Sequence, residues 1–177
     1  MASTYNSDDT FNVVEDHIKQ TLAADTKLTA GGSLAIVTWE QEHREDISTY
    51  EENTLPASSI EVGVQTAEDI AIGDLVDYSY LAHILVITRG GQTLALLQSE
   101  AKYYAARFVR VLQQQHYPDK QLTDLPSDLD GGEPGAVRVN VTSAVVNVGT
   151  SERNPNVLRG LVEIFAVVTV GIQIPED

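Results

Sequence analysis

The sequence predicts an α+β domain: a mostly antiparallel β-sheet flanked by two helices, with a long C-terminal β-hairpin. Two segments have apolar residues at three- and four-residue steps, as amphipathic helices do. Five others alternate between apolar and polar residues or are apolar on both sides, as strands are. The last two strands follow each other across a short connector, which is typical of an antiparallel hairpin. For 177 residues we expect one domain, spanning 1–177.

The first helix is predicted at 9–24, after a loose N-terminal tail at 1–8. Acidic residues cluster in its first turn, where the helix dipole favours negative charge. The sequence AGG at 30–32 ends it, because glycine is a poor helix former. Its apolar positions fall on one stripe: Phe11, Val14, Ile18 and Leu22.

Three strands are predicted next, at 33–40, 59–66 and 78–90. They are rich in β-branched and other apolar residues, and the third is apolar on both sides in its middle. A long acidic loop at 41–58 joins the first two. The stretch AEDIAIGDLVD, at 67–77, is predicted to be a loop or a short turn of helix.

The second helix is predicted at 92–115, where Ala, Leu and Gln dominate and neither Gly nor Pro occurs. A loop at 116–135 follows, rich in Pro, Gly and Asp. Two long strands, 136–149 and 158–174, then form the predicted hairpin. The apolar phase of the first slips near Ser143–Val146, which predicts a bulge or a bend.

Charge and composition exclude several classes of function. The net charge is −15 and the pI about 4.4, so the surface repels nucleic-acid phosphates and anionic membranes. The chain contains no cysteine, which excludes disulfides, thiolate metal sites and thiol nucleophiles. The N-terminus lacks the basic and apolar regions of a signal peptide, and Glu163 and Gln173 interrupt the most apolar segment. We expect a soluble, cytosolic protein with no membrane span.

The sequence contains no motif that indicates catalysis. The histidines, His17, His43, His83 and His116, are not spaced as metal ligands on one element. His83 lies in an apolar strand, which favours a core or interface role over a catalytic one. His43 lies among acids in EQEHREDIS; a solvated acidic loop is the preferred interpretation, and a hard-cation or acid–base site is the alternative.

Motifs for calcium, phosphate and nucleophilic sites are also missing. The stretch DLPSDLDGGEPG lacks the spacing of an EF-hand calcium loop, and the chain has no phosphate-binding glycine loop and no nucleophile elbow. We therefore expect no enzyme activity, no metal and no cofactor.

The second face of the sheet raises the main functional question. One side of strand 158–174 is wholly apolar, whereas the other mixes charge with Leu161, Phe165 and Val167. Two helices cover only one face, and large exposed apolar patches usually mark interfaces. Either copies of the chain cover this face, most simply in a closed ring, or a loop (41–58 or 116–135) folds over it. Arg107 and Arg110, one helical turn apart, either pair with acids of a neighbouring subunit or are ordinary surface charges.

The order and content of these segments resemble the tail terminator (tail-completion) proteins of long-tailed bacteriophages. The matching segments are FNVVEDHIKQTLAAD, SIEVGVQ, SYLAHILVITRG running into LALLQSEAKYYAARFVRVLQQ, and RGLVEIFAVVTV. The resemblance covers roughly residues 10–173 and is one of pattern and order, without a diagnostic motif. The chain departs from the family in its extended loops EHREDISTYEENTLPASS and 116–135, where docking contacts would vary.

The resemblance implies a hexameric ring at the neck end of the tail. Such a ring stops polymerisation of the tail tube, joins the tail to a head-side connector or neck protein, and leaves a bore that DNA crosses without specific binding. It implies assembly in the host cytoplasm and a place in the virion. The residues predicted at the subunit interface are Leu161, Phe165, Val167, Arg107 and Arg110. The acids predicted at the bore or its rim are Glu42, Glu45, Asp46, Glu51 and Glu52.

Three alternatives stay open at this point. Another neck protein or a tail-tube protein would share the structural role, although a tube protein should form long tubes. A monomeric adaptor or binding module would form no ring. A metal-assisted hydrolase built on the acidic loop around His43 would bind a divalent metal.

Overall fold

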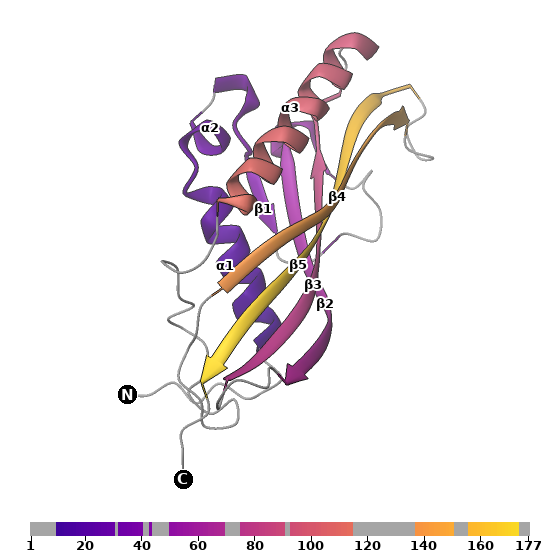
Figure 1. Ribbon diagram of the computed structural model, residues 1–177. Coiled ribbons are helices and arrows are strands. Elements are labelled where there is room, and N and C mark those ends of the chain that lie inside the picture. The colour runs from indigo at the N-terminus through magenta and orange to yellow at the C-terminus, as the bar shows by residue number, and fades with distance from the viewer. Residues whose placement is uncertain are drawn as a thin grey trace.

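The computed structural model describes residues 10–30, 32–40, 43, 50–69, 75–90, 93–114, 137–150 and 156–173. These form one five-stranded sheet with helices on one of its faces (Figure 1). The strands lie in the order β1 (Thr38–Glu40), β2 (Ala57–Asp69), β3 (Leu75–Ile87), β5 (Leu158–Gln173) and β4 (Val137–Thr150). Strand β1 is parallel to β2 and every other pair is antiparallel, so the predicted α+β class is confirmed.

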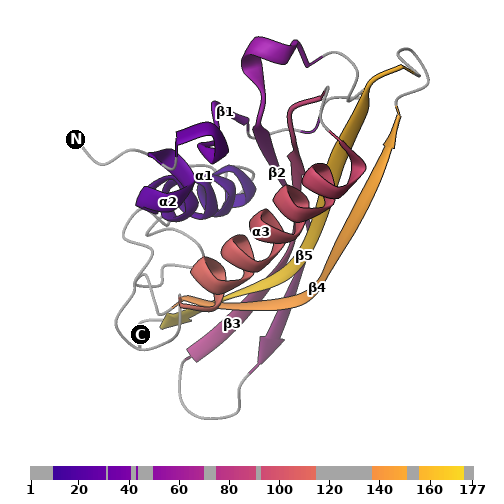
Figure 2. The ribbon, with the colours of Figure 1, turned by 90° about the horizontal axis from the view of Figure 1, so that it is seen from above.

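Two long helices, α1 (Thr10–Ala23) and α3 (Leu94–Gln113), cover the same face of the sheet (Figure 2). The Thr93 hydroxyl caps α3 by accepting the Leu96 N–H at 3.4 Å. A short helix, α2 (Thr26–Thr29), which the sequence did not predict, follows α1. None of the helices in the described ranges is long and apolar enough to cross a membrane.

The core lies between the helices and the sheet. Every second residue of β5 points into it and is fully buried: Val162, Ile164, Ala166, Val168 and Val170. This is the wholly apolar side that the alternation of the strand predicts. Leu22 of α1 and Phe108 of α3 are buried against these strands.

Two local predictions are wrong. The strand at 33–40 is reduced to β1, and Gly32–Leu34 forms a 3₁₀ turn that begins at Gly32, with φ of 67°. The Ile36 N–H donates to the carbonyl of Leu28 at 2.8 Å instead of joining the sheet, so contact with α2 displaces the first half of the strand.

The second wrong prediction concerns the two ends of 67–77, where a loop or a short turn of helix was predicted; residues 70–74 lie outside the described residues. Strand β2 continues to Asp69 and β3 already begins at Leu75, with Asp69 opposite Val76. Leu75 also lies opposite Gln173 of β5, so this part of β3 pairs on both sides. Sheet pairing here outweighs the low strand propensity of the acids.

The predicted irregularity in β4 is present as a bulge. The register with β5 shifts between Val141 and Ser143, just before the predicted position. Val139 is buried before the bulge and Val146 is half-buried after it, so the bulge changes which residues point at α3. The tail at 1–8 and the loop at 116–135 lie outside the described residues.

Candidate functional site: the open face of the sheet

The face of the sheet that points away from the helices is the candidate functional site. Residues paired across antiparallel strands share a face, so the register of β2, β3, β5 and β4 places the side chains of this face in rows. The rows are Ala57–Ile87–Leu161–Asn147, Ser59–Leu85–Glu163–Val145 and Glu61–His83–Phe165–Ser143. Leu81 and Val167 form a further pair beyond the last row.

One end of this face is covered by the chain itself. Tyr50 and Leu55 are buried against Ala57 and Ile87, and Leu161 packs against the same cluster. Of the two sequence-based alternatives for the second face, loop coverage is therefore correct at this end. Leu161 contributes to the cluster within the chain, and its place at a subunit interface stays a prediction.

We call the segment 50–55 the cover, and charged side chains bind it to the sheet. Arg89 Nε donates to the Leu55 carbonyl at 2.8 Å, and Arg159 Nη2 donates to the Tyr50 carbonyl at 3.2 Å. Glu52 Oε1 accepts the Gly90 N–H at 2.7 Å, and Glu52 Oε2 lies 3.5 Å from Arg159. The Tyr50 hydroxyl donates to the carboxylate of Glu40. These contacts hold the cover in place from several directions.

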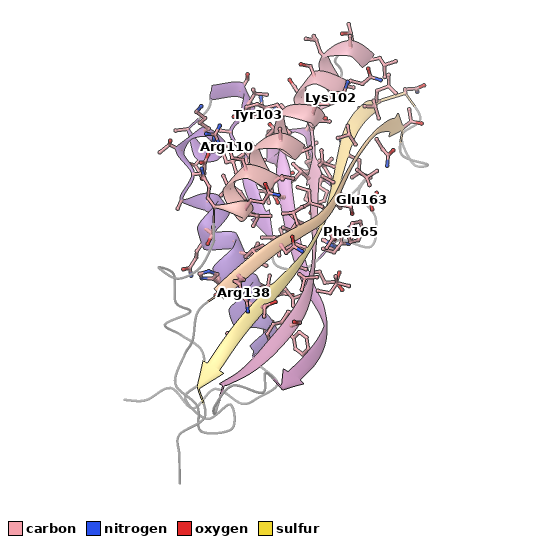
Figure 3. The ribbon with its side chains drawn as sticks, viewed as in Figure 1. Lys102, Tyr103, Arg110, Arg138, Glu163 and Phe165 are labelled. Atoms are coloured by element: carbon pink, nitrogen blue, oxygen red, sulfur yellow. The ribbon has the colours of Figure 1, made fainter. Side chains whose placement is uncertain are left out.

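The other end of the face carries apolar side chains that no described residue covers. Leu81 is 44% exposed and Val145 is 43% exposed, and Phe165 and Val167 are half-buried between them. We call these four residues the open patch. Figure 3 shows Phe165 and Glu163 projecting from the side of the sheet opposite α3. The sequence places Phe165 and Val167 at an interface, and that assignment stays a prediction.

Two histidines lie at the border between the cover and the open patch. His43 Nε2 lies 3.1 Å from His83 Nδ1, and His43 Nδ1 lies 2.8 Å from the Ser59 hydroxyl. The His83 ring stacks on Phe165, with 4.5 Å between centroids and an angle of 2° between planes. Glu61 Oε2 is 3.8 Å from His43 Nε2, so a carboxylate flanks the pair.

Two hydrogen bonds connect this cluster. Ser59 Oγ and His43 Nδ1 share one, His43 Nε2 and His83 Nδ1 share the other, and the tautomers of the two rings determine which atom donates. His83 Nε2 is buried without a hydrogen-bond partner among the described residues and lies 3.6 Å from Glu163. Burial lowers the pKa of His43 and the nearby His83 lowers it further, whereas Glu61 and Glu163 partly oppose the shift.

This cluster differs from the sequence-based expectations. The sequence predicts His43 in a solvated loop, but its side chain is mostly buried on the sheet. Ser59 is 1% exposed, so its hydroxyl is not accessible to a substrate as a nucleophile. Within the part of the chain that the structure describes, no group of three His, Cys, Asp or Glu residues could hold a metal ion.

The two predicted interface arginines on α3 differ in their surroundings. Arg107 forms an ion pair with Asp25, the N-cap residue of α2, through Nε–Oδ1 at 3.0 Å and a second contact of Nη2. The hydrogen bond from Arg107 lowers the pKa of the Asp25 carboxyl. Arg110 is exposed and, among the described residues, has no ion-pair partner. The interface role of both arginines stays a prediction.

The acids predicted at a bore or rim are only partly placed. Glu42, Glu45 and Asp46 lie outside the described residues. Glu51 and Glu52 are exposed beside the cover, and Glu52 contacts Gly90 and Arg159.

The two edges of the sheet are different. At one edge, β1 is only three residues long, and beyond it the Val62 N–H donates to the buried carboxylate of Glu15 on α1 at 2.8 Å. At the other edge, β4 is 14 residues long and contains six valines, no lysine and no proline. No described strand pairs with its outer side. Beside it, residues 147–150, Ile87, Arg159 and Leu161 line a mainly apolar pocket of about 150 Å³.

Comparison with known proteins finds likeness in structure alone. No protein-family model matches the chain, and no curated protein matches it. Among solved structures, it is similar to a chain of the virion of a native gene transfer agent particle, at 14% identity. The likeness covers 90% of this chain and 94% of that chain, with a TM-score of 0.43. At this level it establishes neither a family nor a function.

Proposed function

We propose that this chain is a structural, non-enzymatic protein of a phage-like virion, and that copies of it form a ring at the neck end of the tail. The ring ends polymerisation of the tail tube and joins the tail to a head-side connector or neck protein. The resemblance of the sequence to tail terminator proteins motivates this role. The observation that carries it is the open patch, on the face of the sheet opposite the helices.

The open patch supports self-association for a physical reason. Leu81, Val145, Phe165 and Val167 are contiguous across three neighbouring strands. Burying apolar surface stabilises by roughly 25 cal/mol per Å², so a patch of this kind favours a partner. The same face is closed at its other end by Tyr50 and Leu55, which shows how the chain covers apolar surface where no partner is required.

The edge of β4 supports the same role independently. An exposed edge strand presents unpaired N–H and C=O groups, and soluble monomers usually protect such edges with lysine, proline or a covering element. Strand β4 has neither lysine nor proline, and Arg138 and the bulge at Val141–Ser143 both lie in its first half, so the stretch from Ala144 to Thr150 carries no such protection. The opposite edge is short, and Glu15 accepts the Val62 N–H beyond it. In a ring, neighbouring copies can cover both the edge of β4 and the open patch.

The acidic charge is consistent with a bore for DNA. At a net charge of −15, a channel wall repels phosphate, so DNA passes without binding. We assign Glu42, Glu45, Asp46, Glu51 and Glu52 to the bore or its rim. In this proposal the chain assembles in the host cytoplasm, resides in the virion, and requires no cofactor or membrane.

The first test is the native mass by light scattering across concentration, with negative-stain images of the same sample. We expect a single closed ring with a central hole. Long tubes would identify a tail-tube protein instead. Monomers at every concentration, including in the presence of tail tubes, would support a monomeric adaptor and contradict the proposal.

A matched pair of variants links the ring to the open patch. Phe165→Asp places a charge at the centre of the patch and should abolish the ring while the monomer stays folded. Val37→Asp changes an exposed apolar residue just before β1, outside the open patch, and should leave the ring intact. Loss of folding in Phe165→Asp, seen by circular dichroism, would show that Phe165 belongs to the core.

A further inference from the structure

We infer that the open patch of one copy binds the outer surface of α3 of the next copy. The inference rests on the proposed function, because it specifies the contact from which the ring is built. Along α3, every fourth residue from its first turn is exposed, and we call this row the α3 stripe. Its members are Leu94, Gln98, Lys102, Ala106 and Arg110.

The charges of the two surfaces are complementary. Helix α3 contains three of the chain's eleven Lys and Arg residues and a single acid, Glu100. Lys102 and Arg110 are exposed on the stripe, and neither forms an ion pair with a described residue. The open patch is bordered by two carboxylates, Glu61, whose side chain is 58% exposed, and Glu163. Opposite charges on two surfaces favour their association and determine its register.

The spacing of the charges also agrees. Lys102 and Arg110 are eight residues apart on one helix, which at 1.5 Å per residue is about 12 Å. Glu61 and Glu163 lie two strands apart across the sheet, which is about 9.6 Å, and two residues apart along the strands, which is about 6.8 Å. The diagonal between the two positions is therefore also about 12 Å. One helix can therefore place a cation over each carboxylate.

The centres of the two surfaces fit as well. Ala106 lies midway between Lys102 and Arg110 on the stripe. In this contact it lies over β3 next to the His83 ring, which stacks on Phe165, and its small side chain permits a close approach of the helix.

The position of the two surfaces makes the contact head-to-tail. Lys102 and Arg110 project from the helical side of the molecule, and Glu163 and Phe165 project from the other side of the sheet (Figure 3). One copy can therefore use both surfaces at once, with a different neighbour on each. Contacts between two different surfaces generate closed rings or open filaments, which is the assembly geometry that a ring requires.

The test is a charge exchange between two variants. The first carries Lys102→Glu and Arg110→Glu, so its stripe repels its own patch. The second carries Glu61→Lys and Glu163→Lys, so its patch repels its own stripe. Each variant alone should self-associate at least about tenfold more weakly than the parent chain. An equimolar mixture should assemble again, because the two kinds of copy can alternate with complementary charges at every contact.

Cysteine cross-linking tests the same contact without changing charge. The chain has no cysteine, so introduced thiols react uniquely. Ala106→Cys and Ser143→Cys, the latter paired with Phe165 across the strands, should cross-link to each other through a short bismaleimide. Replacing Ala106→Cys with Gln20→Cys, at an exposed position on α1, should abolish the product.

The outcomes separate this inference from the proposed function. If the parent forms a ring and both charge variants form it equally well, the contact is wrong and the ring stands. The same holds if the ring forms but Ala106→Cys and Ser143→Cys give no cross-link. If the parent stays monomeric under all conditions, both the proposed function and this contact are contradicted. Circular dichroism of each variant shows whether it folds.

Discussion

The two faces of the sheet are built from the same strands, yet their side chains are buried to different degrees. On β5, the residues that point at the helices are fully buried from Val162 to Val170, whereas Phe165 and Val167, which alternate with them, are half-buried. Helices α1 and α3 complete the first face within the chain. The second face is completed only at one end, by Tyr50 and Leu55. The first face therefore stabilises the monomer, and the uncovered end of the second face is where we propose that the next copy binds.

The largest expected effect compares neighbouring residues on the two faces. Ile164→Ala removes a fully buried side chain, which should lower the free energy of unfolding by about 2–5 kcal/mol because a cavity remains. Phe165→Ala removes a larger side chain from the open patch and should cost the monomer less than about 1.5 kcal/mol, mainly its stacking on His83. Urea denaturation of both variants, at a concentration where the chain is monomeric, measures the difference. Equal costs would contradict the division between the faces.

The next prediction concerns the close approach of α3 to the sheet. A Cβ on Gly160 would lie 2.9 Å from Thr88 Cγ2 and 3.2 Å from the Cβ of Ala101. The Gly160 N–H also donates to the Thr88 hydroxyl at 2.7 Å. Gly160→Ala should therefore lower the free energy of unfolding by about 1–3 kcal/mol through overpacking.

A second glycine provides the control. A Cβ on Gly149, in the exposed edge strand β4, would meet no atom within 4 Å. Gly149→Ala should leave stability unchanged or raise it slightly. Thermal denaturation of the two variants side by side would contradict the argument if Gly149→Ala were the more damaging.

The helical face could be predicted from sequence because its signal is local. The alternation of β5 and the apolar stripe of α1 identify their own buried residues, and the structure confirms the buried side of β5 together with Val14, Ile18 and Leu22. The periodic pattern of α3 identifies its buried residues from Leu97 onward, whereas Leu94 is exposed. The strand predicted at 33–40 was wrong over 33–37, because contacts with α2, which are not local, determine the backbone there. The loop predicted at 67–77 was wrong at its two ends for a similar reason, since pairing extends β2 and β3 into it.

The candidate site could be predicted only in part. Phe165 and Val167 were identified because the period of β5 places them on the second face. Val145 and Glu61 were missed, because their place in the rows around Phe165 depends on the register of the strands. The contact of His43 with His83 spans 40 residues, and no pattern in either segment indicates it. The periodicity of a strand identifies which of its residues share a face of the sheet. Which residues of other strands lie next to them depends on how the strands pair.

A smaller effect is expected on the helical side, where Asp25 joins α2 to α3. Asp25→Asn keeps an N-cap for α2 but removes the charge that pairs with Arg107, and should lower the free energy of unfolding by about 1 kcal/mol. The hydrogen bond from Arg107 lowers the pKa of Asp25 in the fold, so the parent has this stability above the carboxyl's usual value of 3.8 and loses it in more acidic solution. The cost of Asp25→Asn should therefore shrink at low pH.

The exposed Arg110 serves as the control for this pair. Arg110→Ala removes a cation from the same helix and should change monomer stability by less than about 0.5 kcal/mol at any pH. A cost as large as that of Asp25→Asn, measured by urea denaturation, would show that helix charge in general, and not the Asp25–Arg107 pair, is responsible.

The smallest expected effect lies at the border of the open patch and depends on pH. Burial and the neighbouring His83 lower the pKa of His43 below its usual 6.5, so the unfolded chain binds a proton there more readily than the folded chain does. The free energy of unfolding should therefore decrease as the pH falls through about 6.5, and this slope should be weaker in His43→Gln, which keeps a hydrogen-bonding group but does not titrate. Glu61 and Glu163 oppose the shift, so Glu61→Gln should steepen the slope. Identical slopes in the parent and His43→Gln, from urea denaturation between about pH 7.5 and 5.5, would show that His43 does not contribute. A slope confined to His43 would show that the open face responds to pH between about 7.5 and 5.5, at the edge of the surface proposed to bind the next copy.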